Sequence, residues 1–157
     1  DQEGRETLLK QRLAPLRERY DYIFIDCPPS LELLTLNALV AADTVLVPVQ
    51  SEFYALEGLS DLNASIKRVN QRMNPNLKLE GLVLTMYDAR TKLALDVESA
   101  LRMHFPGKVY DTKIPRNVRL SEAPSHGKPC IAYDKSSKGT RAYLHLANEF
   151  LKKQRKE

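Results

Sequence analysis

A short apolar run that ends at a carboxylate and two prolines constrains this chain more than any other feature: Tyr22-Ile23-Phe24-Ile25-Asp26-Cys27-Pro28-Pro29-Ser30. β-Branched and aromatic residues suit a strand that is covered on both faces. The prolines cannot donate ladder hydrogen bonds, so the strand should end near Asp26. Ligands of open α/β sheets bind at the carboxyl ends of the strands, where a carboxylate suits a hydrated Mg²⁺ ion on a nucleotide phosphate. The alternative is an aspartate that only caps a turn.

The rest of the sequence predicts helices that alternate with strands. Helices are predicted over residues 6–20, with a kink at Pro15, and over residues 31–42, 56–73, 93–105 and 139–153. Strands are predicted over residues 22–26, 44–49, 79–86 and 109–112, and residues 114–138 form a long irregular segment. This alternation implies parallel βαβ units. We therefore expect a single domain with an α/β fold, built on a doubly wound and mainly parallel sheet.

The last predicted helix has an apolar stripe that we expect to face the core. Its members are Tyr143, Ala147, Phe150 and Leu151. The residues that follow, Lys152 to Lys156, are nearly all charged and are typical of a solvated helix end. A helix of this kind predicts packing against the sheet and gives no sign of membrane insertion.

The composition is that of a globular protein. The chain has 157 residues, 43% of them hydrophobic, which is enough for a sizeable core. The 24 basic and 20 acidic residues permit contact with nucleic acid without requiring it. Cys27 and Cys130 show neither a CxxC nor a Cys/His spacing, so no zinc site or disulfide framework is indicated. The absence of a signal peptide and of any apolar segment near 18 residues predicts a cytoplasmic protein without a membrane span.

One element of a nucleotide-binding α/β domain is missing from the sequence. Such a domain normally opens with a strand and a glycine-rich phosphate loop, yet none of the six glycines begins a GxxxxGK[ST] motif. The chain opens in charged helical sequence instead, as though cut from something longer. We therefore expect these residues to lack the phosphate cradle.

Several sequence blocks, in order along the chain, carry a resemblance to a known family. They are residues 26–30 (DCPPS), 34–39 (LTLNAL), 48–50 (PVQ), 54–59 (YALEGL), 84–91 (LTMYDART), 114–125 (IPRNVRLSEAPS), and 133–134 (YD) leading to 137–139 (SKG). The chain closely resembles the ParA (Soj-like) chromosome and plasmid partition ATPases. The resemblance covers residues 20 to about 151 and concerns only the C-terminal part of the family. It implies an incomplete P-loop NTPase domain of the deviant Walker A class, whose Walker A region would precede Asp1.

The resemblance assigns a nucleotide site that holds ATP and Mg²⁺. Asp26 is similar to the Walker B carboxylate, which holds a water of the Mg²⁺ shell and so contacts the metal indirectly. Cys27, Pro28 and Pro29 are similar to the start of switch II, which senses the γ-phosphate. For Cys27 the alternative is a small buried residue, because free cysteine packs as a hydrophobe.

Two residues of the irregular segment resemble the loop that embraces the adenine. They are Pro115 and Asn117. An asparagine amide can donate to and accept from a purine edge, which suits base recognition. The alternative for Asn117 is a residue that only forms a turn.

Two arginines match those with which ATP-bound dimers of the family hold DNA without sequence preference. They are Arg90 and Arg119, with Lys92 and Arg116 as possible helpers. The physics agrees, because a guanidinium on a loop tip neutralises phosphate and each such contact adds to the salt dependence of binding. The alternative is an exposed arginine with no ligand.

The resemblance also implies partners. We expect the protein to form a homodimer when ATP is bound and to bind non-specific DNA of the bacterial nucleoid. We also expect a ParB-type protein that stimulates hydrolysis. The ATP state would control attachment to DNA. Glu52 and Tyr54 are candidates for the dimer face.

Two alternatives stay open at this point. One is a non-catalytic DNA-binding or regulatory module, which the missing phosphate loop favours. The other is a MinD-like cell-division ATPase, which Cys27-Pro28-Pro29 and the charged C-terminus oppose. The phosphate-loop strand of this class is expected beside residues 22–26, so the isolated chain should expose a flat apolar edge. We therefore expect this chain to associate and not to hydrolyse ATP.

Overall fold

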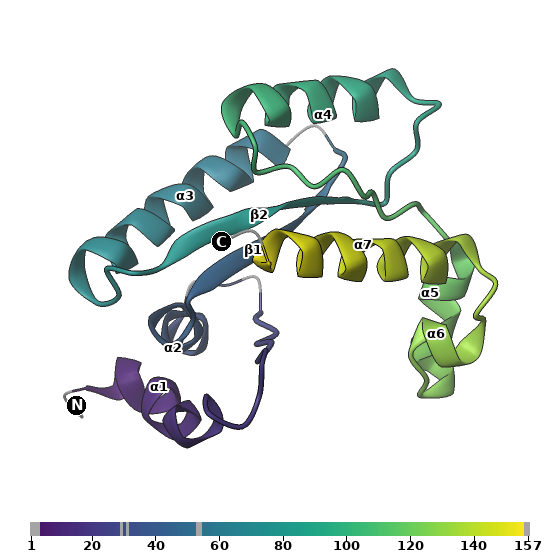
Figure 1. Cartoon of the computed structure of the whole chain (residues 1–157). Coiled ribbons are helices and arrows are strands. Elements are labelled where there is room, and N and C mark those ends of the chain that lie inside the picture. The colour runs from purple at the N-terminus through teal and green to yellow at the C-terminus, as the bar shows by residue number, and fades with distance from the viewer. Residues whose placement is uncertain (1–3, 29, 31, 53–54, 156–157) are drawn as a thin grey trace. The chain divides into compact units, whose positions relative to one another are not determined.

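The computed structural model describes residues 4–28, 30, 32–52 and 55–155, and it is an α/β structure (Figure 1). Its elements are η1 (Arg5–Thr7), α1 (Leu8–Leu13), η2 (Ala14–Leu16), α2 (Leu33–Ala41), β1 (Thr44–Gln50), α3 (Ala55–Arg72), β2 (Lys78–Thr85), α4 (Lys92–His104), α5 (Val118–Glu122), η3 (Ala123–His126), α6 (Cys130–Tyr133) and α7 (Lys138–Gln154). The chain divides into two compact units, Asp1–Val45 with Leu59–Glu80 and Leu46–Gly58 with Gly81–Glu157. Each unit has its own core.

The sheet of the described residues consists of β1 and β2, which lie side by side and run parallel (Figure 1). Near one end of the pair the Lys78 amide donates to the Asp43 carbonyl at 3.1 Å, and at the other the Ser51 amide donates to the Thr85 carbonyl at 3.4 Å. Helix α3 makes the crossover that parallel strands require. The predicted parallel α/β arrangement is confirmed, as are the helices and strands predicted between residues 31 and 105.

The core of the first unit lies between α2, α3 and the entry to β2. It consists of Leu39, Val40, Ile66, Val69 and Leu77. Beside it, Asn74 is buried and its Nδ2 donates to the Leu39 carbonyl at 3.0 Å and to the Ala42 carbonyl at 2.7 Å. One asparagine therefore satisfies two carbonyls at the end of α2, where the intrahelical ladder stops.

The core of the second unit lies between β2 and α7. It is formed by Val83, Tyr110 and Ile114, against which Leu46, Leu120, Ala142, Leu146 and Phe150 pack. The stripe predicted for the last helix is therefore only partly right. Phe150 packs on this core, but Tyr143, Ala147 and Leu151 are exposed. The packed face runs through Ala142 and Leu146 instead, because both recur with Phe150 at the helical spacing of four.

The strand predicted over residues 109–112 is reduced to single parallel bridges. Val109 pairs with Leu82, and Pro115 pairs with Tyr87. The six residues from Leu82 to Tyr87 thus face seven residues from Val109 to Pro115, which leaves a bulge at residues 111–113. The amides of Asp111 and Thr112 in this bulge turn away from the sheet, because each donates to the Glu149 carboxylate, at 2.8 Å in both cases.

The strand predicted over residues 22–26 is wrong for this chain. These residues form no strand, and Phe24 is 73% exposed. The sequence has the right propensity, but a strand also needs a neighbour that completes its hydrogen-bond ladder. The helix predicted over residues 6–20 is interrupted as expected: α1 ends at Leu13, Pro15 lies in the 3₁₀ turn η2, and Tyr20 is exposed.

Candidate functional site

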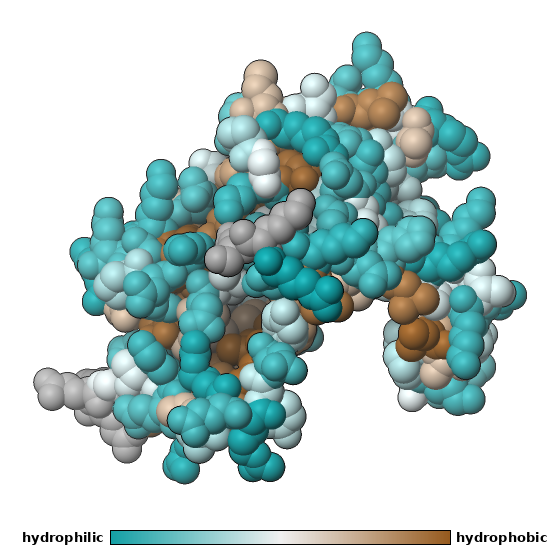
Figure 2. Space-filling model, in the orientation of Figure 1, coloured by the Kyte–Doolittle hydropathy of each residue, from teal (hydrophilic) through white to brown (hydrophobic). Residues whose placement is uncertain are grey.

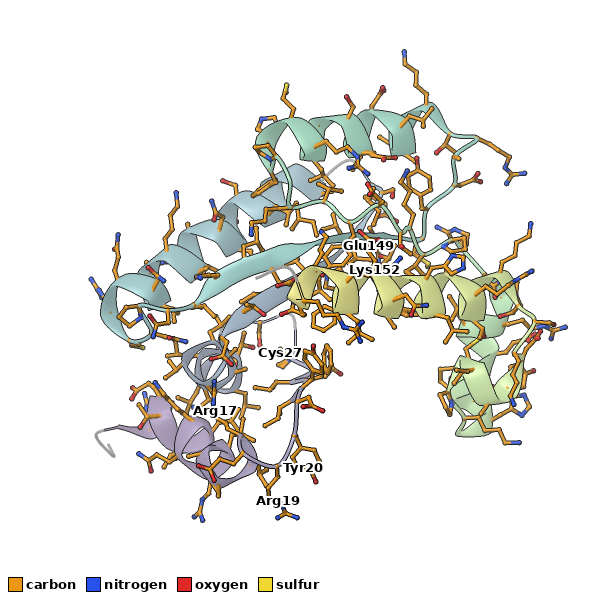
Figure 3. All side chains as sticks on the ribbon, in the orientation of Figure 1. Arg17, Arg19, Tyr20, Cys27, Glu149 and Lys152 are labelled. Atoms are coloured by element: carbon orange, nitrogen blue, oxygen red, sulfur yellow. The ribbon has the colours of Figure 1, made fainter. Side chains whose placement is uncertain are left out.

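The predicted magnesium carboxylate, Asp26, is exposed on the extended segment that precedes α2. Next to it, partial burial and then the Asp26 charge raise the pKa of the Cys27 thiol. Cys27 is exposed, so the expected small buried residue is not what the structure contains (Figure 3). The segment therefore presents a carboxylate and a protonated thiol side by side.

A buried hydroxyl ties this segment to α2. Thr35 Oγ1 donates to the Ser30 carbonyl at 2.6 Å and lies 3.3 Å from the Pro28 carbonyl. Sequence reasoning missed Thr35, although a threonine in the first turn of a helix after a Pro-Pro turn is a recognisable signal. Pro29, the third residue of the predicted switch, lies outside the described residues.

The predicted adenine residues lie on the segment that leads from the bulge into α5. Asn117 is the N-cap of α5, and its Oδ1 accepts a hydrogen bond from the Arg119 amide at 3.0 Å. This bond engages the oxygen side of the Asn117 amide. A Cβ atom on Gly139 would lie 2.6 Å from Leu120 Cγ and 3.1 Å from Asn117 Oδ1, so only glycine lets α7 approach this loop so closely.

An open surface cavity of about 620 Å³ lies beside Pro115. Lys113, Lys138 and Arg141 line it together with Asp111. Three cations against one carboxylate give the cavity a positive character that suits an anionic ligand. Sequence reasoning did not single out Lys138 or Arg141, because their convergence on Lys113 depends on how α7 packs.

The loop of the predicted DNA arginine Arg90 starts with a strained residue. Met86, just after β2, has φ at 51°, in the left-handed region that non-glycine residues rarely adopt. At Met86 the chain leaves β2 and continues into the loop that starts with Tyr87 and Asp88. Thr91 then caps α4, because its Oγ1 accepts from the Ala94 amide at 3.3 Å.

The carboxylate of Asp88 holds Arg90 from two sides. Arg90 Nε donates to Oδ1 at 2.9 Å, and Nη2 donates to Oδ2 at 2.7 Å. The Arg90 amide also donates to Oδ1, at 3.1 Å. The side-chain and backbone hydrogen bonds from Arg90, together with the charges of Arg90 and Arg116, lower the pKa of Asp88 to about 2.

The second predicted DNA arginine is held in a similar way. Arg119 Nη1 donates to Glu122 Oε2 at 2.8 Å, and its Nε lies 3.5 Å from Asp134 Oδ2. The Tyr133 hydroxyl donates to the same Glu122 oxygen at 3.3 Å. Both arginines are therefore on the surface of the second unit, and both are paired with carboxylates.

Glu98 of α4 connects the Arg90 loop with the bulge. Its Oε2 accepts from the Tyr87 hydroxyl at 2.7 Å, and its Oε1 lies 2.7 Å from Lys113 Nζ and 3.1 Å from Arg102 Nε. The hydrogen bond to Glu98 raises the pKa of Tyr87 to about 12. Together with the Tyr87–Pro115 bridge, this network joins the arginine loop to the predicted adenine loop.

The remaining candidates are less informative. Lys92 begins α4, and Arg116 is exposed between the half-buried residues Pro115 and Asn117. Glu52 is exposed, and Tyr54 lies outside the described residues. Within the described ranges, no group of three or more His, Cys, Asp or Glu side chains could hold a metal ion by itself.

The class of this protein follows from comparison with known families. A family model described as an AAA domain matches residues 1–79, which is just over half of the 157 residues. The chain therefore belongs to this family of AAA domains. Its fold is that of the P-loop NTPases. Cobyrinic acid a,c-diamide synthase from Mycobacterium smegmatis, solved with ADP and magnesium, aligns with a TM-score of 0.80 and 37% identity over 98% of this chain and 56% of that one.

Closer relatives place the chain within this class. It is 57% identical to the sporulation initiation inhibitor protein Soj of Bacillus subtilis, over 93% of this chain and 58% of that protein. It is 55% identical to the chromosome partitioning protein ParA of Myxococcus xanthus, over 98% of this chain and 54% of that protein. The chain thus spans less than two thirds of these relatives. Over most of its own length the chain is therefore highly similar to ParA and Soj proteins.

Proposed function

We propose that this chain is part of a ParA-type ATPase that segregates chromosomes or plasmids and binds nucleoid DNA without sequence preference. The observation that carries the proposal is the placement of Arg90 and Arg119 on the surface of one compact unit, with the Pro115–Asn117 loop bridged to the Arg90 loop. A guanidinium group that contacts a phosphate neutralises its charge without carrying sequence information, as expected for binding without sequence preference.

Each unit, taken by itself, offers a residue type that suits one part of an ATP–Mg²⁺ ligand. Magnesium keeps most of its waters and is held through one or two carboxylates plus substrate phosphates, so the single exposed Asp26 is sufficient as a protein contribution. Asn117 would donate to the adenine through Nδ2, since its Oδ1 already caps α5. When bound, Mg²⁺ would neutralise charge on the phosphates.

We assign two further properties to the whole protein, namely dimerisation and stimulation by a partner. Dimerisation around ATP, with Glu52 near the dimer face, and stimulation by a ParB-type partner belong to that proposal. The relatives at 55% and 57% identity carry partition and sporulation names, which favours partition over a MinD-like role in cell division. No helix in the described part of the chain combines the length and apolar character of a membrane span.

DNA binding by the chain tests the proposal. A fluorescent duplex would be titrated at low salt, with and without ATP–Mg²⁺, using the parent chain and the Arg90→Ala and Arg119→Ala variants. We expect both variants to bind more weakly, whereas the control Arg12→Ala, an exposed arginine of the first unit, should bind as the parent does. Equal binding by all variants would refute the assigned DNA surface. Absence of binding throughout would support the alternative in which only the ATP-bound dimer of a longer protein creates that surface.

A further inference from the structure

The carboxylate of Asp88 occupies the Nε–Nη2 edge of Arg90, one of the two guanidinium edges that can bind a DNA phosphate in bidentate fashion. It receives Nε and Nη2 of Arg90, at 2.9 and 2.7 Å, in a bidentate pair that uses both carboxylate oxygens. The same two N–H groups form the fork that binds a phosphate in bidentate fashion. The Arg90 side chain is 89% exposed, so a phosphate could reach it, but a phosphate that binds this edge must compete with the carboxylate.

A second cation, Arg116, also acts on the Asp88 carboxylate. Arg116 is joined to the Arg90 loop through the main chain, because its amide donates to the Tyr87 carbonyl at 3.4 Å. Its positive charge contributes to the lowered pKa of Asp88. Release of Arg90 would therefore not leave Asp88 without a cationic neighbour, and the cost of breaking the pair is reduced.

We propose that Asp88 is an affinity-determining gate that withholds the Nε–Nη2 edge of Arg90 from DNA and gives it up only when a phosphate displaces the carboxylate. The inference rests on the proposed DNA-binding function. It assigns a role to the acid of the Tyr87-Asp88-Ala89-Arg90 stretch, for which the resemblance offered none. An opposite role is physically possible, in which Asp88 presents Arg90 to the phosphate, and it predicts the opposite experimental result.

Asparagine is the right substitution for the test. The Arg90 amide donates to Asp88 Oδ1, which closes a turn of the loop, and an asparagine oxygen can accept that bond equally well. Asp88→Asn therefore keeps the turn and removes the charge. Asp96→Asn makes the same change of net charge at an exposed position of α4 and is the matched control.

The experiment measures duplex affinity and its salt dependence for five proteins: the parent, Asp88→Asn, Asp96→Asn, Arg90→Ala and the Asp88→Asn/Arg90→Ala double variant. Exposed ion pairs are weak, so we expect Asp88→Asn to tighten binding by about two- to fivefold beyond Asp96→Asn. The salt slope should steepen as the Arg90 contact is completed. On the Arg90→Ala background, Asp88→Asn should act no differently from Asp96→Asn.

The outcomes separate this inference from the proposed function. If the parent binds DNA but Asp88→Asn binds no better than Asp96→Asn, or binds worse, the gate is refuted and the DNA-binding proposal stands. If Asp88→Asn tightens binding equally with and without Arg90, the effect is general electrostatics and the gate is again refuted. If neither the parent nor Asp88→Asn binds DNA at low salt, this chain has no DNA surface by itself, and both the gate and the DNA surface assigned to the isolated chain are refuted.

Discussion

Gly81 in β2 is the position at which the packing of the second unit can be tested most sharply. A Cβ atom there would lie 2.6 Å from the Lys108 carbonyl oxygen and 2.6 Å from the Tyr110 ring. Neither neighbour can move cheaply, because the Lys108 carbonyl accepts the Leu82 amide at 2.8 Å and Tyr110 is fully buried. We therefore expect Gly81→Ala to push the segment at residues 108–110 away from β2.

The expected loss of stability follows from three contributions. Overpacking of this kind costs about 1–3 kcal/mol. Weakening of the Leu82–Lys108 hydrogen bond adds about 0.5–1.5 kcal/mol. Alanine lowers the conformational entropy of the unfolded chain, which offsets about 0.4–1 kcal/mol of this loss of stability. The net effect is a destabilisation of about 0.5–4 kcal/mol, with a fall in Tm of about 2–4 °C per kcal/mol for a chain of this size.

Thermal and urea unfolding followed by circular dichroism would measure this loss. Gly58→Ala in α3 is the control, because a Cβ atom there meets nothing within 4 Å. The control should be unchanged or more stable by up to about 1 kcal/mol, since alanine is the better helix former. A Gly81→Ala variant that melts at or above the parent, beside a well-behaved Gly58→Ala, would refute the described packing of β2.

Three further predictions address single contacts. Asn74→Ala should lower the free energy of unfolding by about 1–3 kcal/mol in urea titrations, because two main-chain carbonyls lose their partner; an unchanged midpoint would contradict this. Glu149→Gln should speed hydrogen exchange at the two bulge amides, and equal exchange in both proteins would count against their capture by the carboxylate. The carboxyl of Asp88 should titrate by NMR near pH 2 and return toward 3.8 in Arg90→Ala. Because its folded pKa is depressed, its stabilising contribution is present above pH 3.8 and is lost as the pH falls toward 2.

The elements between residues 31 and 105 could be predicted because their signals are local. Periodicity marks α3 and α4, and apolar runs mark β1 and β2. The strand at residues 22–26 could not be judged in the same way. Its apolar run is real, but whether it becomes a strand depends on a neighbouring chain segment. Residues 109–112 failed as a strand for a different reason, since Glu149 on a distant helix captures the amides that a ladder would use.

The candidate site was predictable in its residue types and only partly in its contacts. Asp88 and Arg90 are two residues apart, and Arg119 and Glu122 are three apart, so both pairings lay within reach of sequence reasoning. The cavity beside Pro115 could not be predicted from the sequence, because the cations that line it come from α7 and from the bulge. The helices α5 and α6 lie inside the predicted irregular segment. They begin directly after the N-cap residues Asn117 and Pro129, of which asparagine is an ordinary helix-start signal.

The salt dependence of DNA binding tests the central claim most directly. The logarithm of the association constant would be plotted against that of the salt concentration for the parent chain and the Arg90→Ala/Arg119→Ala double variant, on two duplexes of unrelated sequence. Loss of two phosphate contacts predicts a slope that is shallower by about 1.8 in the double variant, with equal affinity of the parent for both duplexes. An unchanged slope, or a strong preference for one duplex, would contradict a DNA surface built on these two arginines.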